Sequence, residues 1–329
     1  MKLAVLGAGG IVPDFLEAAS KIPRAEICAI YGRESSRSRM LAYQAQYGIP
    51  HLYMDYGQLL EDRQVEGVYV ALPNHLHHEF AKKALEAKKH AIIEKPFASN
   101  GRQARELVEL AEKNGVFVFE AISNLYMPNY KKTRELVKGL GKVKVVQMNF
   151  SQYSSRYDKF KEGVVLPVFD PEQSGGALMD INVYNVHFIL GLFGKPQKIS
   201  YHANIERGID TSGVLLLEYP GFQCVAVGAK DCQAPASISI QGEEGYLYST
   251  QPANVYDGFS LGKGRGETED FALNGGFPRL YHELMAFVGM VEGRDGGLFC
   301  KASRHSLDVM DVLDEARRQA GVAIGPING

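Results

Sequence analysis

The first 120 residues alternate short apolar runs with longer amphipathic stretches, and this rhythm narrows the possible folds most. Runs that are apolar throughout are typical of strands buried on both faces of a parallel sheet. The stretches between them carry apolar residues at helical spacing, as Ala104, Leu107, Leu110 and Ala111 do. A strand-helix-strand repeat indicates a parallel sheet with right-handed crossovers. We expect strands at 2–6, 26–30, 65–72, 90–94 and 116–120, and helices at 13–22, 35–47, 75–88 and 101–114.

The rhythm changes after Glu120. The later strand-like runs follow one another across short Gly, Pro and Asp turns, which favours antiparallel pairing. We therefore expect an α/β chain with a doubly wound parallel sheet first, then an α+β domain with an open, mostly antiparallel sheet. The later strands are expected at 143–153, 198–206, 212–220, 222–230, 236–242 and 245–250, and the helices at 128–138, 176–192, 281–291 and 304–320.

Size and composition restrict the classes of function. A chain of 329 residues exceeds the usual size of one compact domain, so we expect two, at 1–121 and 122–329. The formal charge of −2, with acidic and basic residues interspersed, predicts no nucleic-acid surface and no polybasic membrane signal. No apolar run approaches the roughly 18 residues of a membrane span. The expected partner is a small molecule.

The N-terminus and the cysteines favour a cytoplasmic protein. The opening MKLAVLGAGG breaks at glycines and lacks the cleavage site of a signal peptide. Cys28, Cys224, Cys232 and Cys300 show no CxxC spacing, so the sequence predicts neither a disulfide framework nor a metal site.

A glycine-rich turn, LGAGGI, directly follows the first expected strand and opens the first helix. This is the context of the dinucleotide-binding fingerprint of a Rossmann domain, although Val12 stands where the third glycine would be. The helix N-terminus offers N–H groups to a pyrophosphate. A turn that binds no nucleotide remains the alternative. The expected cofactor-binding residues here are Gly7, Gly9, Gly10 and Ile11.

The end of the second expected strand bears on the choice of cofactor. An acidic residue there would bind the ribose 2′-OH of NAD, but the sequence reads Tyr31-Gly32-Arg33. Arg33, with Arg37 behind it, is suited to hold the 2′-phosphate of NADP through charge-assisted hydrogen bonds. This favours NADP over NAD. Glu34 turning toward the ribose, or arginines that are merely solvated, are the alternatives.

Two further turns lie at the carboxyl ends of expected parallel strands, where open α/β sheets bind ligands. A lysine directly after a buried strand, as Lys95 is, points into a crevice or bears a desolvation cost. Its alternative role is an ion pair with Glu94, and the alternative for His77 is a helix-face or capping histidine. The expected cofactor-binding residues of the two turns are Leu72, Pro73, Asn74, His77, Glu94 and Lys95.

In the second half, Asp180, Tyr184 and His187 have the spacing of one helix face. Three proton-capable groups on a stripe that would otherwise pack a core suggest a wall facing a substrate, with a structural polar network as the alternative. Arg156 is a candidate to bind an anionic or hydroxyl-rich substrate, although an exposed arginine is the default expectation.

Taken together, the motifs resemble the Gfo/Idh/MocA family, named after glucose-fructose oxidoreductase and inositol dehydrogenase. The likeness spans nearly the whole chain. The motifs occur in family order: GAGGI, Pro73-Asn74-x-x-His77, ALEAKKHAIIEKP, Glu120-Ala121 with Pro128, and GGALMDINVY.

The resemblance implies an NAD(P)-binding Rossmann domain over 1–121 and a substrate-binding and oligomerisation domain over 122–329, with dimers or tetramers formed through its sheet. It implies that Lys95 is the catalytic lysine and that Asp180 is the family aspartate. Tyr184 stands where many members have histidine, so the chain is similar to the tyrosine subgroup, with glucose-fructose oxidoreductase and dimeric dihydrodiol dehydrogenase. Asn182 and Leu125 depart from the family pattern near the substrate pocket.

The expected reaction is reversible hydride transfer between nicotinamide and a carbinol or carbonyl carbon of a sugar, polyol or dihydrodiol-like substrate. Tyr184 would exchange the hydroxyl proton, Lys95 would stabilise the alkoxide, and Asp180 would orient the substrate. One alternative is a redox-assisted hydrolase or epimerase that retains its cofactor. The other is a non-catalytic dinucleotide-sensing regulator.

Overall fold

The computed structural model describes residues 1–264, 266 and 268–324, and the chain forms two compact units. The first comprises Met1–Ala121 and Phe277–Leu307. The second comprises Ile122–Gly276 and the segment from Asp308 onward. The division after Ala121 coincides with the expected domain boundary, whereas 277–307 lies within the range expected for the second domain and packs with the first unit.

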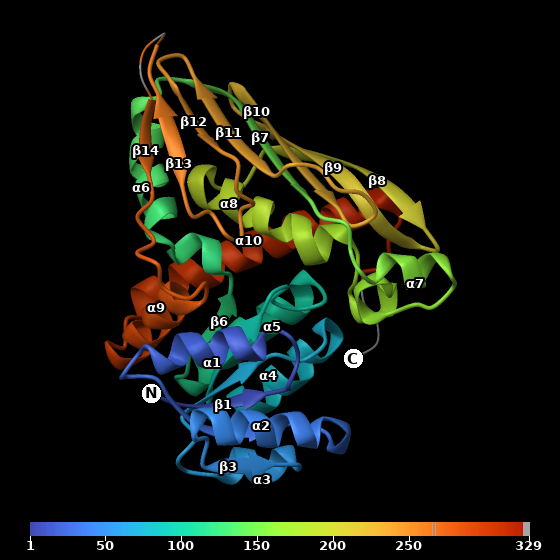
Figure 1. Ribbon diagram of the computed structural model, residues 1–329, viewed down its shortest axis with the longest axis vertical. Helices are drawn as coiled ribbons and strands as arrows, with labels where there is room; N and C mark the ends of the chain where they lie inside the picture. The colour runs from blue at the N-terminus through green and yellow to red at the C-terminus, as the bar shows by residue number, and fades with distance from the viewer. Residues whose placement is uncertain (265, 267, 325–329) are drawn as a thin grey trace. The chain divides into compact units, whose positions relative to one another are not determined.

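The first unit is built on six parallel strands in the order β3-β2-β1-β4-β5-β6 (Figure 1). The order reverses between β1 and β4, which is the ligand-binding switch point of a doubly wound sheet. The last four residues of β1 and all of β4 are buried, which explains why their sequences are apolar on both faces. The strands are β1 (Lys2–Leu6), β2 (Glu26–Tyr31), β3 (His51–Tyr53), β4 (Gly67–Val70), β5 (His90–Glu94) and β6 (Val118–Ala121).

The expected helices of this unit are present. Helix α5 has the predicted bounds because Asn100 caps its start, accepting from the Gln103 amide at 3.0 Å, and Gly115 ends it in the left-handed region at φ 66°. Short 3₁₀ segments before α2 and α4 shift their starts by two residues. The helices are α1 (Val12–Ser20), α2 (Arg37–Tyr47), α3 (Tyr56–Glu61), α4 (His77–Glu86) and α5 (Gly101–Asn114). Helix α3 and strand β3 were not expected.

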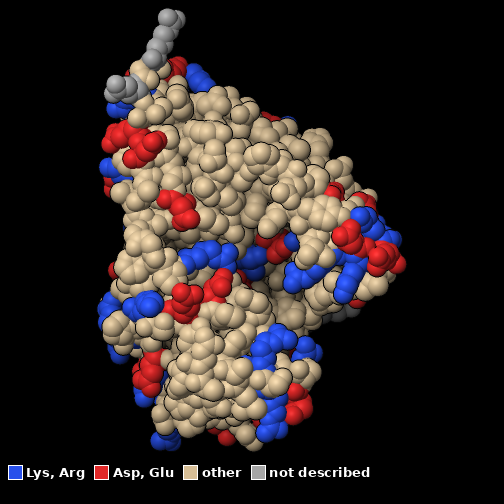
Figure 2. All heavy atoms as spheres, viewed as in Figure 1, with Lys and Arg blue, Asp and Glu red and all other residues tan. Residues whose placement is uncertain are grey.

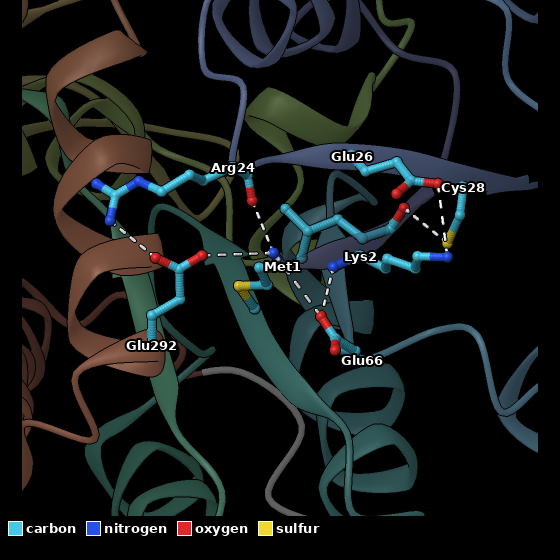
Figure 3. Close-up of polar contacts among 8 residues, drawn as sticks. Met1, Lys2, Arg24, Glu26, Cys28, Glu66 and Glu292 are labelled. Carbon is cyan, nitrogen blue, oxygen red and sulfur yellow. Dashed lines mark hydrogen bonds and ion pairs between the residues drawn. The ribbon is translucent and has the colours of Figure 1, made fainter.

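Aromatic and ionic contacts attach the segment 277–307 to the first unit. Phe287, on α9 (Tyr281–Glu292), stacks on Phe119 of β6 with ring centroids 4.7 Å apart. Arg24 binds the Glu292 carboxylate at 2.8 Å, and the Met1 amino nitrogen lies 3.8 Å from the same carboxylate (Figure 3). These contacts are between residues more than 150 positions apart, so no local pattern predicts them.

The second unit contains an eight-stranded open sheet in the order β14-β13-β12-β11-β7-β10-β9-β8. Strands β7 and β10 pair in parallel and all other neighbours are antiparallel, which confirms the expected mostly antiparallel sheet. The last two strands in sequence are short and were not expected. The strands are β7 (Val143–Ser151), β8 (Lys198–Glu206), β9 (Ile209–Tyr219), β10 (Phe222–Ala229), β11 (Ser237–Gly242), β12 (Tyr246–Ser249), β13 (Phe259–Gly262) and β14 (Thr268–Phe271).

Helices cover one face of this sheet: α6 (Pro128–Leu136), α8 (Val183–Phe193) and the later part of α10 (Gly296–Ala320), whereas the short α7 (Tyr157–Lys161) lies at one end (Figure 1). The segment Pro171–Phe193 contains a window whose mean hydropathy is high enough to cross a membrane, although Asp180, Asn182 and Asn185 interrupt its apolar residues. That window is 78% buried inside the protein, as is typical of a core helix.

Candidate functional site

The glycine turn after β1 has no room for a side chain at Gly7 but has space at Gly9 and Gly10. Gly7 has φ +107°, and a Cβ there would lie 2.5 Å from the Ala71 carbonyl oxygen beyond β4, so only glycine fits. A Cβ at Gly9 would lie 4.0 Å from that oxygen, and at Gly10 it would meet nothing within 4 Å. Ile11 then leads into α1, whose positive N-terminus follows. This cradle fits a dinucleotide pyrophosphate.

Arginines gather in the sequence behind β2. Arg33 and Arg37 are both exposed, and Arg37 binds Glu34 at 3.3 Å. Glu34, the alternative partner for a ribose, forms this exposed ion pair with Arg37. Arg39, which sequence reasoning missed, donates from Nη1 to the Ala8 carbonyl at 2.8 Å. The guanidinium of Arg39 thus braces the glycine turn, and those of Arg33 and Arg37 are exposed after β2, where guanidinium groups are suited to bind a phosphate.

His77 ties together the turns that follow β4 and β5. Its side chain is fully buried, with Nδ1 2.9 Å from the Pro96 carbonyl oxygen and Nε2 2.9 Å from that of Leu72. Burial lowers its pKa, so the ring is neutral and donates to one of the two carbonyls. The structure gives His77 a role in positioning the turns, not in contacting a ligand. Leu72, Pro73 and Asn74 are half-buried on the first turn.

Glu94 is the last residue of β5, and Lys95 follows it at the carboxyl edge of the sheet. The Tyr69 hydroxyl donates to the Glu94 carboxylate at 2.5 Å, and burial raises the pKa of Glu94. The Glu283 carboxyl on α9 is also buried, and burial together with the charge of Glu94 raises its pKa well above the usual value. Glu94 is thus held in the interior through Tyr69, while Lys95 stands half-buried at the strand end.

In the second unit, Asp180 lies in a π-helical turn, Leu178–Asn182, that precedes α8. The expected helix over 176–192 is therefore not continuous α-helix. Side-chain exposure falls along it: the Asp180 side chain is 29% exposed, Tyr184 is 9% exposed and His187 is fully buried. His187 is accordingly a core residue here, because the helix turns it toward the packed interior. π-helical turns are frequent at functional sites.

A buried carboxylate caps this π-helical turn. Oδ2 of Asp210 accepts hydrogen bonds from the Leu178 amide at 2.7 Å and from the Tyr201 hydroxyl at 2.8 Å. Gly176 has φ +102°, and a Cβ there would lie 2.1 Å from Oδ1 of Asp210. Asp210 is fully buried, and this desolvation raises its pKa to about 6.

Strand β10 holds the other side of the turn. Asn182 donates to the Ala226 carbonyl at 3.1 Å, and a Cβ at Gly228 would lie 2.5 Å from the Asn182 Cβ. Asn182, a departure from the family pattern, is thus a packing residue, and Gly228 makes room for it. Leu125, the other departure, lies against Gly191.

Sequence reasoning missed Lys230, which follows β10 and carries no motif. Its side chain is 7% exposed, and its ammonium donates to Oδ2 of Asp180. Arg156, expected near a substrate, is exposed just before α7. Among the described residues, no three or more His, Cys, Asp or Glu side chains are grouped to hold a metal ion.

Comparisons with known proteins cover nearly the whole chain. Residues 1–122 match the oxidoreductase family with an NAD-binding Rossmann fold, and residues 130–248 match the GFO/IDH/MocA C-terminal domain. The chain is 32% identical over 326 residues to scyllo-inositol 2-dehydrogenase (NADP(+)) IolU of Bacillus subtilis (strain 168), covering 98% of each. It is 27% identical over 343 aligned positions to trans-1,2-dihydrobenzene-1,2-diol dehydrogenase of Sus scrofa, covering 98% of this chain and 97% of that protein.

Among solved structures, KijD10, a 3-ketoreductase from Actinomadura kijaniata in complex with NADP and TDP-benzene, superposes with a TM-score of 0.85. The sequences are 23% identical, and the match covers 97% of each chain. At this identity the likeness establishes the fold.

Proposed function

Because the chain belongs to the Gfo/Idh/MocA oxidoreductase family, we propose that it is an NADP-dependent dehydrogenase or reductase acting on a CH–OH or carbonyl group. The substrate class we propose is a cyclic polyol, sugar or dihydrodiol-like molecule. The observation that carries the proposal is the full-length likeness to an NADP-dependent inositol dehydrogenase. The closed glycine turn at Gly7 supports it, because its shape fits a dinucleotide.

We assign the cofactor to the carboxyl edge of the parallel sheet. The pyrophosphate would lie on the glycine turn, at the positive end of α1. The exposed guanidinium of Arg33, with Arg37, would take the 2′-phosphate. The remaining cofactor contacts are proposed at Leu72, Pro73, Asn74, Glu94 and Lys95.

The bound nicotinamide supplies or accepts the hydride. In the oxidising direction Tyr184 would remove the substrate hydroxyl proton, and the Lys95 ammonium would stabilise the negative charge that develops on that oxygen. An ionised carboxylate only accepts hydrogen bonds, so Asp180 would select a substrate that donates them, as a hydroxyl group does. Arg156 would contact a further polar group of the substrate.

A fluorescence titration with NADPH and NADH tests the cofactor assignment. The chain has no tryptophan, so the signal is the emission of the nicotinamide itself. Arg33→Ala should weaken NADPH binding by about 10- to 100-fold, the worth of a charge-assisted contact, and leave NADH binding unchanged. Arg63→Ala, an exposed arginine before β4 at the opposite edge of the sheet, is the matched control. Equal affinity for both cofactors in wild type would contradict the assignment of Arg33.

Turnover tests the chemistry. Wild type is assayed with NADP⁺ on scyllo-inositol and on trans-1,2-dihydrobenzene-1,2-diol, following absorbance of the reduced cofactor. Lys95→Ala should bind NADPH and lose turnover by about 100-fold or more, because charge stabilisation in the transition state is the largest catalytic contribution. A Lys95→Ala protein with wild-type turnover would refute the role of this lysine.

The outer face of the second sheet supports a homo-oligomer. Its exposed side chains are largely uncharged and include Val214, Tyr246 and Tyr248, on β9 and β12. Figure 2 shows a broad area without charge over these strands. We propose a homodimer or homotetramer formed through this face, and light scattering after size exclusion measures the oligomeric state.

The four cysteines are free thiols, which supports a reducing cytoplasm as the location of the protein.

A further inference from the structure

We propose that Lys230 fixes the orientation of Asp180 and thereby acts as a positioning residue for substrate binding. This inference rests on the proposed function, which places Asp180 against the substrate. The Lys230 side chain is 7% exposed and donates to Oδ2 of Asp180. An ammonium buried to this degree needs an anionic partner, and Asp180 provides one.

Backbone hydrogen bonds and an aromatic contact hold Lys230 in place. Its amide donates to the Thr211 carbonyl at 2.8 Å, and its carbonyl accepts from the Ser154 amide at 2.8 Å. The ammonium lies 5.8 Å from the ring centroid of Phe169, which is fully buried in an aromatic cluster with Tyr157 and Phe160. A lysine is normally flexible, but these contacts leave this one little freedom.

The turn that bears Asp180 has other anchors. Asn182 bonds to the Ala226 carbonyl and Asn185 to the Val227 carbonyl, each at 3.1 Å, and Asp210 caps the start of the turn. Removing the ammonium of Lys230 therefore leaves the backbone of the turn held and removes one contact of the Asp180 side chain. This distinguishes a positioning role from a role in the fold.

The chemical consequence concerns the substrate contact. Because Lys230 engages Oδ2, the carboxylate plane is set by the protein before any ligand arrives. Asp180 is then a fixed acceptor for a substrate hydroxyl. Less conformational entropy is therefore lost when the substrate binds.

The test compares Lys230→Met, Lys230→Arg, Asp180→Asn and the double variant with wild type, using NADP⁺ and scyllo-inositol. Lys230→Met should lower kcat/KM by about 100-fold, the effect of a misplaced contact group, without changing NADPH affinity. Lys230→Arg should recover most of the loss, and the double variant should match Asp180→Asn within about twofold. Lys198→Met is the control, since it removes a lysine from an exposed ion pair with Glu218 in the same sheet.

Urea unfolding of the same proteins tests the pair independently of turnover, with non-additive effects of the two substitutions expected. Wild-type kcat/KM in Lys230→Met, or additive losses in the double variant, overturns the positioning role. If wild type turns over neither scyllo-inositol nor the dihydrodiol while unfolding shows coupling, the assignment of these two substrates fails and the Lys230–Asp180 pair stands. Additive effects of the two substitutions on the free energy of unfolding would overturn the Lys230–Asp180 pair itself.

Discussion

Replacing Asp210 with asparagine should change how the stability of the protein depends on pH. Asp210 is fully buried and its pKa is raised from 3.8 to about 6 by desolvation. A carboxyl whose pKa is higher in the folded state keeps its proton longer there. Its stabilising contribution is complete below pH 3.8, falls as the pH rises toward 6, and is absent above.

The magnitude follows from this shift. Over the whole range the loss amounts to about 3 kcal/mol, at about 1.4 kcal/mol per pKa unit. About 2 kcal/mol of this loss falls between pH 4.5 and pH 7, because the contribution to stability no longer changes once the folded carboxyl has ionised. Asparagine has nearly the same shape, and its carbonyl oxygen can accept from both the Leu178 amide and the Tyr201 hydroxyl.

The assay is urea unfolding followed by circular dichroism at pH 4.5, 5.5 and 7. The free energy of unfolding of Asp210→Asn minus that of wild type should rise by about 2 kcal/mol across this range. All other titrating groups contribute to both proteins and cancel in the difference. Asp257→Asn, at an exposed aspartate of the same unit, should follow wild type at every pH. A difference that stays constant from pH 4.5 to pH 7 would refute the reasoning.

Two further predictions address the packing around the site. His77→Ala leaves the one carbonyl, of Pro96 or of Leu72, that accepts from the ring without its donor, and should lower the free energy of unfolding by about 1–3 kcal/mol. Burial lowers the pKa of His77, so wild type should lose stability as the pH falls below about 6.5, and His77→Ala should lose less over that range in denaturant titrations. Gly228→Ala would place a Cβ 2.5 Å from that of Asn182 and should destabilise by about 1–3 kcal/mol. Adding Asn182→Gly should restore part of this loss, and a purely additive double variant in thermal unfolding would contradict the contact.

The elements that the sequence predicted best are those with local signals. Helix α5 begins and ends where predicted because Asn100 and Gly115 are strong boundary residues in the sequence itself. The buried strands of the parallel sheet appear as continuous apolar runs because both of their faces are buried. Strand β3 has only three residues, and β14 reads TEDF, which is mostly exposed and polar, so neither shows a strand pattern.

The parts of the site that the sequence did not predict depend on contacts between distant residues. Asp210, 32 positions after Leu178, caps the first amide of the π-helical turn. Lys230 follows an ordinary strand, and only the packing of that strand against the turn brings it to Asp180. Arg33, Arg37 and Arg39 look alike in sequence, and only the structure shows that Arg39 is the one that binds the glycine turn.

The two aspartates around the π-helical turn are in opposite environments, and this separates their roles. Asp210 is fully buried among neutral donors, the Leu178 amide and the Tyr201 hydroxyl, so desolvation raises its pKa. Asp180 is partly exposed, and its carboxylate binds the ammonium of Lys230. Asp210 therefore shapes the turn, and Asp180 is the carboxylate for which we propose a contact with the substrate.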